Sequence, residues 1–367
     1  MKTVKKEQIK TDRIRAENHF AKWGADMLKK SRIVATWAIC LVFLGLCLPG
    51  CSSVKSGEPV ISPKVILKLG TETALSTPET RGSQKLAELV KEKSNGTLLI
   101  EVFENAKLGT MKERDEGMRM GTVDMGTSSV GFLASYVPIA GIFDLPYIYK
   151  DKAHELRVFD SEVGREIDKN LQAQGLRVVC YFDAGTRQIT NNRRPVREVA
   201  DLKGIRIRVP QAEASVEGFK ALGAIPTPLP FGEVYASLRQ GVVEGQENPI
   251  SIIMYNRLYE VQKYLSLTNH QMFIQVLTIS EKTWQRLSSA HQKVLVESAV
   301  EAQAYQRDIA AAEEVALIKT LREKGMEVND VKDAAAFAER AKPLREIYIK
   351  KLGQPAKDLF DKIDALR

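Results

Sequence analysis

The segment Asp201-Leu-Lys-Gly-Ile-Arg-Ile-Arg-Val-Pro210 indicates both a strand of an α/β sheet and a binding site. Apolar and basic residues alternate along the strand in the order Ile205, Arg206, Ile207, Arg208 and Val209. Successive side chains of a strand point to opposite faces, so both arginines lie on one face. Ligands of open α/β sheets bind beyond the carboxyl ends of the strands. Arg208, close to the strand-ending Pro210, is therefore the better placed arginine to contact a ligand.

Arginine at this position favours binding of a carboxylate. A guanidinium can donate two parallel hydrogen bonds to one carboxylate, which a lysine cannot do. Two solvated arginines on an exposed strand are the alternative, and this segment alone leaves both interpretations open. Arg187, in a predicted loop after a strand, and Asn248, in a predicted turn over residues 244–249, can contact the same anion.

Strands and helices alternate on both sides of this segment. The sequence predicts strands over residues 64–69, 97–103, 123–127 and 176–182, and helices over 111–120 and 154–174 and from Pro78, with Thr77 as N-cap. A second cycle begins near Gly185, with a strand over 205–209 and helices over 212–222 and 231–240. The apolar segment 272–279 returns the chain to the first sheet. This alternation favours largely parallel α/β sheets.

A helical pattern from Ser288 to about Lys324 would be on the order of 54 Å long. It has no heptad seam, so contact with two lobes explains its length better than burial within one. A chain of 367 residues is also long enough for two α/β lobes with a ligand cleft between them. The predicted lobe I comprises residues 64–184 and about 274–313, and lobe II comprises 185–273 and about 314–367.

The formal net charge of +8 does not indicate a nucleic-acid partner. Residues 1–32 hold ten Lys or Arg and four Asp or Glu, and residues 33–50 hold no charged residue. The rest of the chain has 44 basic and 42 acidic residues, a net charge of +2 without a basic stripe. Nucleic-acid binding is therefore not expected.

Residues 1–50 are predicted to be a signal peptide. An apolar stretch over 33–48 follows basic residues at 29–32 and ends at Pro49-Gly50-Cys51. A transmembrane anchor is the alternative, because 18 uncharged residues are near the lower limit for crossing a hydrocarbon layer of about 30 Å. The residues before Met27 are unusually polar for a leader, which makes Met27 an alternative start.

The cysteines agree with export. Leu48-Pro49-Gly50-Cys51 resembles a bacterial lipobox, although Pro49 departs from the usual small or β-branched residue. Cys51 is therefore predicted to be lipidated and to tether the protein to a membrane outside the cytoplasm, with residues 51–63 as a linker. Cys180 then remains alone in an apolar run and is predicted to be a buried thiol without a catalytic role.

Taken together, these segments resemble the substrate-binding subunits of tripartite ATP-independent periplasmic (TRAP) transporters, the DctP type of extracytoplasmic solute receptor. The matching stretches in chain order are Ser94-Asn-Gly96, Leu108-Gly109, Gly121-Thr-Val-Asp-Met125, Asp144-Leu-Pro-Tyr147, Gly185-Thr-Arg-Gln-Ile-Thr-Asn-Asn192, Asp201–Pro210, Gly223-Ala-Ile-Pro226, Phe231-Gly-Glu-Val-Tyr-Ala-Ser-Leu238 and Gly245-Gln-Glu-Asn-Pro249. The likeness covers nearly all of residues 64–367. So many motifs in one order make a chance match improbable.

The resemblance implies a two-lobed, periplasmic-binding-protein-like fold that closes around hinge strands and a long shared helix, without a metal or cofactor. Arg208 matches the family arginine that pairs with the ligand carboxylate, and Arg187 matches a second arginine near it. Asn248 matches an asparagine that hydrogen-bonds the carboxylate, and Phe231 matches an aromatic residue of the cleft. The implied function is capture of a small organic acid and its delivery to the TRAP permease subunits in the membrane.

Two departures from the family pattern affect the ligand. Glu244 replaces a common aspartate, which is expected to be harmless. Residues 71–79 lack a histidine that some members carry, and residues 128–130 are variable in the family. Whether the ligand is a sugar acid, a dicarboxylate or a keto acid therefore stays open.

Transport has two alternatives. An enzyme is not expected, because the sequence shows no nucleophile with a base, and the histidines outside the leader, His154, His270 and His291, lack metal-ligand spacing. Glu247 has no paired acid and is better explained as a residue that orients an arginine. A sensory lipoprotein that passes the same ligand to a receptor is the second alternative, which the sequence leaves open.

Overall fold

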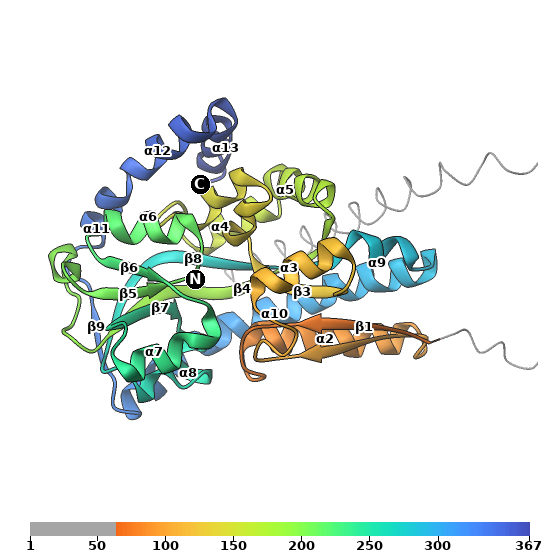
Figure 1. Cartoon of the computed structure of the whole chain (residues 1–367), viewed down its shortest axis with the longest axis horizontal. Coiled ribbons are helices and arrows are strands. Elements are labelled where there is room, and N and C mark those ends of the chain that lie inside the picture. Colours follow the sequence, from red (N-terminus) through yellow and green to blue (C-terminus); the bar gives the residue numbers. More distant parts are fainter. Residues whose placement is uncertain (1–63) are drawn as a thin grey trace, which may run out of the picture.

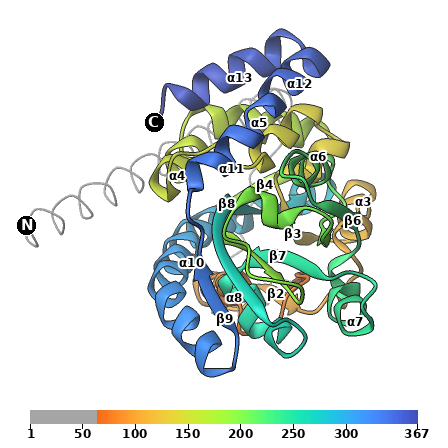
Figure 2. The same ribbon diagram turned by 90° about the vertical axis from the view of Figure 1, so that its left-hand side faces the viewer.

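The computed structural model describes residues 64–367, and the predicted signal peptide, lipidated Cys51 and linker lie outside them. The strands are β1 (Val65–Gly70), β2 (Leu98–Phe103), β3 (Met125–Ser129), β4 (Leu176–Asn191), β5 (Arg206–Val209), β6 (Ile225–Pro228), β7 (Gly245–Pro249), β8 (Tyr264–Ser280) and β9 (Glu327–Asp330). The α-helices are α2 (Pro78–Lys93), α3 (Met111–Met120), α4 (Lys152–Phe159), α5 (Glu162–Ala173), α6 (Glu213–Ala221), α7 (Val234–Gln240), α8 (Ile250–Tyr255), α9 (Glu281–Arg286), α10 (Ser289–Glu323), α11 (Ala334–Ala341), α12 (Pro343–Leu352) and α13 (Gln354–Asp364). They form two α/β lobes, as predicted (Figures 1 and 2).

One sheet runs through both lobes in the order β2-β1-β3-β8-β4-β7-β5-β6, and β9 pairs with β8. The strand β1 is parallel to its neighbours β2 and β3, and β5 is parallel to its neighbours β6 and β7. The strands β4 and β8 are antiparallel to each other and extend from one lobe into the other, as Figure 1 shows. The parallel pairs agree with the alternation of strands and helices in the sequence.

The two long strands bend where they pass between the lobes. Their register shifts between Asp183 and Gly185, and Gly185 has φ +96°, a value that side chains other than glycine rarely adopt. Beyond this bulge, residues 187–191 of β4 pair with β7, whereas residues 275–279 of β8 pair with β3 in the other lobe. Both strands therefore belong to the sheets of both lobes, and the bulge provides a place where the sheet can bend.

The helix α10 connects the two cores. Its residues Leu295 and Ala302 pack in the core formed by β1, β2 and α2. Its residues Leu317 and Leu321 pack in a second core, together with residues of α7 and α8. In between, the side chain of Gln306 bonds both the backbone N–H and the carbonyl of Asp183 at the bulge. The prediction of a long helix shared by both lobes is confirmed.

Some local predictions were wrong. The helix expected over 154–174 is divided into α4 and α5, because the Ser161 hydroxyl accepts from the N–H of Val163 and caps a new helix. Residues 245–249 form the strand β7 and not part of a turn, and β4 continues through Gly185. Thr77 precedes α2, but its side chain makes no capping hydrogen bond to that helix.

The C-terminal helices contact both lobes: Phe337 of α11 packs in the core around β5, whereas α13 packs against lobe I. Leu359 and Ile363 of α13 share a core with Val163 and Ile167 of α5. The predicted division assigned residues 314–367 to lobe II, so this packing differs from it. The residue limits of the two lobes otherwise stay a prediction.

Candidate functional site

Arg208 lies near the carboxyl end of β5, and its side chain is buried. Its neighbours Ile207 and Val209 pack in a hydrophobic core on the opposite face, which fixes the direction of the arginine. Its Nε and Nη2 donate to the carbonyl of Leu229 at 2.9 and 2.6 Å, and its guanidinium carbon lies 5.9 Å from the centre of the Phe231 ring. Arg206, two residues earlier on the strand, is exposed.

Among residues 64–367, no group of opposite charge contacts the guanidinium of Arg208. Its side chain is only 3% exposed, and within residues 64–367 no carboxylate lies at ion-pair distance from it. Burial lowers the pKa of Arg208 to about 10, against the opposing effect of Glu247, so the group stays protonated at neutral pH. A buried cation without a counter-ion is costly, and an anion bound beside it would remove that cost.

Arg187 on β4 is buried, but unlike Arg208 it has a carboxylate partner. Its Nε and Nη2 donate to the two carboxylate oxygens of Glu247 on β7, with an Nη2–Oε1 distance of 2.8 Å. Nη2 also donates to the Glu247 carbonyl at 2.8 Å and to Asn248 Oδ1 at 3.2 Å. The guanidinium stacks on the ring of Phe273 with 4.4 Å between its carbon and the ring centre. The position of Arg187 is therefore fixed from several directions.

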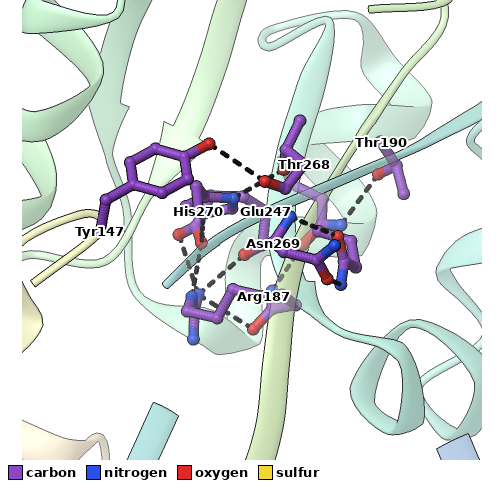
Figure 3. Close-up of polar contacts among 10 residues, drawn as sticks. Tyr147, Arg187, Thr190, Glu247, Thr268, Asn269 and His270 are labelled. Carbon is purple, nitrogen blue, oxygen red and sulfur yellow. Dashed lines mark hydrogen bonds and ion pairs between the residues drawn. The ribbon is translucent and has the colours of Figure 1, made fainter. Parts of the chain in front are cut away.

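Glu247 is held by a second residue, His270 of β8. The distance from His270 Nε2 to Glu247 Oε2 is 3.1 Å, and Thr268 Oγ1 lies 2.8 Å from His270 Nδ1 (Figure 3). Burial raises the pKa of Glu247, but Arg187 and His270 outweigh this effect and hold it at about 2. Burial lowers the pKa of His270, so its ring is neutral at pH 7, with Nε2 as donor to Glu247 and Nδ1 as acceptor from Thr268. As predicted, Glu247 orients an arginine.

Asn248 is part of a chain of buried amides. Its Nδ2 donates to Gln246 Oε1 at 2.5 Å, while its Oδ1 accepts from Arg187. Gln246 in turn donates to Thr190 Oγ1, which donates to Gln262, both at 2.8 Å. Sequence reasoning missed Gln246 and Thr190, although both lie in stretches that it singled out.

The structure brings the four predicted site residues into one region of lobe II. Arg187 and Asn248 are hydrogen-bonded, Arg208 pairs with Gln246 across β5 and β7, and Phe231 lies beside Arg208. Their roles in binding stay predictions.

The first lobe contributes two buried acids that sequence reasoning missed. Ser129 donates to Asp144 Oδ2 at 2.6 Å, and Ser128 donates to both carboxylate oxygens of Asp115 at 2.6 and 2.7 Å. Burial raises the pKa of Asp144 to about 6 and that of Asp115 to about 7. Asp144 lies in the stretch Asp144–Tyr147, which is part of the family resemblance, but this stretch does not indicate that Ser129 is its hydrogen-bond partner.

Cys180 is buried, and burial raises the pKa of its thiol. No group of three His, Cys, Asp or Glu side chains within residues 64–367 is arranged to hold a metal ion. Over the same residues, no helix is long and apolar enough to cross a membrane.

Fold and site together define a two-lobed binding protein with an uncompensated cation between buried polar residues. The chain is 34% identical over 302 residues, 82% of this chain and 92% of the relative, to the 2,3-diketo-L-gulonate-binding periplasmic protein YiaO of Escherichia coli. It is similar, with a TM-score of 0.80 and 30% identity, to the sugar acid binding protein DctPAm of Advenella mimigardefordensis in complex with galactonate; the match covers 83% of this chain and 99% of that chain. A TRAP periplasmic solute-binding protein of Sulfurospirillum deleyianum with bound succinate has a TM-score of 0.79 and 28% identity, with 83% and 100% covered.

The family profile for bacterial extracellular solute-binding protein, family 7, the DctP family, matches residues 69–351. The chain therefore belongs to this family of TRAP solute-binding proteins. The family and the relatives named above are binding proteins, which agrees with the expectation of a non-enzyme.

Proposed function

We propose that this protein captures a small organic acid outside the cytoplasm and delivers it to the TRAP permease subunits. The observation that carries this proposal is the buried charge of Arg208, which has no anionic partner in contact within the described residues. The relatives support the ligand class, because their names or structures record diketogulonate, galactonate and succinate. Each of these compounds carries at least one carboxylate.

In the proposed complex, Arg208 donates to the ligand carboxylate while still held by the Leu229 carbonyl. Arg187 lies near enough to Arg208 to lower the pKa of that residue. The ion pair with Glu247 holds Arg187 in place. Asn248 donates or accepts at the same carboxylate, and Phe231 covers the apolar side of the ligand. Closure of the lobes excludes water and strengthens these contacts, because charges interact more strongly where the dielectric constant is low.

The lobes of the proposed protein move about the bulge at Gly185, with residues 64–184 and about 274–313 as the core of lobe I. A contact between the lobes supports this: the N–H of Ala74, in the loop after β1, donates to Asn256 Oδ1 after α8 at 3.2 Å. This contact joins a loop of lobe I to lobe II and forms only when the two lobes approach each other.

We further propose that residues 1–50 are removed as a signal peptide and that Cys51 is lipidated. The expected result for cells grown with labelled palmitate is incorporation of label into the wild-type protein and its loss in Cys51→Ser. Cys180→Ser is the matched control, because Cys180 is buried and should leave the label unchanged. Equal labelling of wild type and Cys51→Ser would refute the anchor.

The proposed function predicts that acids, but not matched neutral sugars, stabilise the protein against heat. A ligand present at 1,000 times its dissociation constant adds about 4 kcal/mol to the free energy of unfolding. This should raise Tm by several degrees or more. The measurement is thermal melting against sugar acids, dicarboxylates and keto acids, each beside its neutral analogue. If no acid raises Tm, or if a neutral analogue does so equally, the proposed function is wrong.

A further inference from the structure

The end of helix α8 in lobe II contacts lobe I through Asn256. Asn256 Oδ1 accepts from the N–H of Ala74, in the loop after β1, at 3.2 Å. The helix α8 packs with Leu317 of α10 in the core of lobe II, whereas Leu69 of β1 packs in the core of lobe I. The hydrogen bond therefore joins two segments that belong to different cores, and it breaks when the lobes move apart.

The side chain of Asn256 is oriented for this contact by its own helix. Its Nδ2 donates to the carbonyl of Ile252, one turn earlier in α8, at 3.1 Å, so Oδ1 is the atom that faces lobe I. The next residue, Arg257, has φ +59°, a left-handed conformation that is common where helices end. The amide of Asn256 thus presents a hydrogen-bond acceptor at a fixed position.

The loop of lobe I that supplies Ala74 is held by its own hydrogen bonds. The Ala74 carbonyl accepts from the N–H and from the hydroxyl of Thr77, at 3.1 and 2.8 Å. The hydroxyl of Thr73 donates to Glu79 Oε1 at 2.8 Å, and the side chains of Thr73, Thr77 and Glu79 are buried. The carbonyl of Ala74 is therefore bonded within lobe I, while its N–H is bonded to lobe II.

A second contact lies beside the first. Glu313 of α10 pairs with Arg81 of α2 through Oε1, and its Oε2 accepts from the hydroxyl of Tyr255 at 3.0 Å. Burial and the hydrogen bond to Glu313 raise the pKa of the Tyr255 hydroxyl, so this group stays protonated and can donate. Because α2 packs in the core of lobe I and α8 in that of lobe II, one carboxylate connects a helix of each lobe.

Given the proposed function, we infer that Asn256 and Tyr255 form a latch that holds the lobes together over a bound acid and sets how long the acid stays. These two successive residues differ from the four predicted ligand-binding residues. They act on the position of the lobes and not on the acid itself. A contact that forms after the acid has entered the cleft slows its release but not its entry.

The variant Asn256→Leu tests the latch, because leucine has a similar size but neither a donor nor an acceptor. The probe is the acid that binds the wild type most tightly among galactonate, diketogulonate, succinate and pyruvate, and stopped-flow fluorescence measures its rates. The probe is expected to leave the variant about three- to tenfold faster, with an unchanged association rate, because one hydrogen bond between the lobes is lost.

The matched control is Asn192→Leu. Asn192 also bonds two backbone groups, with Nδ2 donating to the Val261 carbonyl and Oδ1 accepting from the N–H of Lys263, both at 2.7 Å. All of these groups belong to the predicted lobe II, so this variant should keep the dissociation and association rates of the wild type.

Two further measurements keep the test independent of one substitution. With the probe bound, the N–H of Ala74 should exchange with solvent faster in Asn256→Leu than in the wild type, whereas the N–H of Thr77, bonded within the loop, should stay protected. Tyr255→Phe keeps the ring but loses the donor to Glu313, and it should raise the dissociation rate about two- to fivefold.

The possible failures of the latch and of the proposed function are distinguishable. If the probe leaves Asn256→Leu and Tyr255→Phe at the wild-type rate, and the exchange of the Ala74 N–H is unchanged, the latch is wrong and the proposed function stands. If none of the four acids binds the wild type, the proposed function fails, and this inference fails with it.

Discussion

Replacement of Arg208 by alanine is expected to weaken binding of the ligand by about 30-fold to several thousandfold, or about 2–5 kcal/mol. The reason is that the ligand carboxylate would be buried without the cation that compensates it. The stability of the free protein should change little, because removal of a buried charge without an ion-pair partner among residues 64–367 offsets the loss of the hydrogen bonds to the Leu229 carbonyl. Titration calorimetry measures the affinity, and thermal melting without ligand measures the stability.

The same strand supplies the control for this prediction. Arg206 has the same side chain on the same face, but it is exposed and bonds the carbonyls of Gly241 and Val242. Arg206→Ala should therefore bind the ligand as the wild type does. Arg208→Lys should lie between wild type and alanine, because lysine keeps the charge but loses the planar pair of donors. A loss of affinity below threefold in Arg208→Ala would contradict the assignment of the carboxylate to this residue.

The two-lobed α/β fold could be predicted from the alternation of strands and helices, because the spacing of apolar residues within each segment indicates its secondary structure. The long strands were not predicted at full length. The strand expected over 176–182 continues to Asn191, because the second half of β4 is stabilised by pairing with β7 and β8, which are distant in sequence. Likewise, the polar residues of β7 indicated a turn, although burial of its whole length makes it a central strand.

Chemistry of the site could be predicted in part. The alternation of side chains along a strand placed Arg206 and Arg208 on one face of β5. Only the three-dimensional packing shows that Arg206 is exposed and Arg208 buried. Glu247 was predicted to orient an arginine, but neither the identity of that arginine, Arg187, nor the contribution of His270 to the pair was predicted. The acids of lobe I were missed because their partners, such as Ser129 for Asp144, are defined only once the loops fold over β3.

The pair of Arg187 and Glu247 gives the largest expected effect on stability. Both side chains are almost fully buried, at 2% and 1% exposure. Glu247→Ala leaves Arg187 buried without its counter-ion, so the free energy of unfolding is expected to fall by about 3–5 kcal/mol. Urea denaturation measures this value. The control is Glu327→Ala, which removes an exposed partner of Lys263 and should cost less than about 1 kcal/mol.

The pH dependence of this loss follows from the pKa of Glu247. Its pKa in the folded protein is about 2, below the ordinary value of 4.5, so its stabilising contribution is complete above pH 4.5 and is lost as the pH falls toward 2. The difference between wild type and Glu247→Ala should therefore be constant from pH 6 to 8 and shrink below pH 4.5. A difference that grows on acidification would have the wrong sign for an ionised Glu247.

A double replacement separates the cost of an unpaired charge from the value of the pair. Arg187→Met combined with Glu247→Leu removes both charges and fills the space with apolar atoms. Because well-packed apolar residues can replace a buried ion pair at little cost, the double variant should recover most of the stability lost in Glu247→Ala. It should still bind ligand more weakly than the wild type, since Arg187 would no longer supplement Arg208. If the double variant is as unstable as the single one, packing around His270 and not the unpaired charge explains the loss.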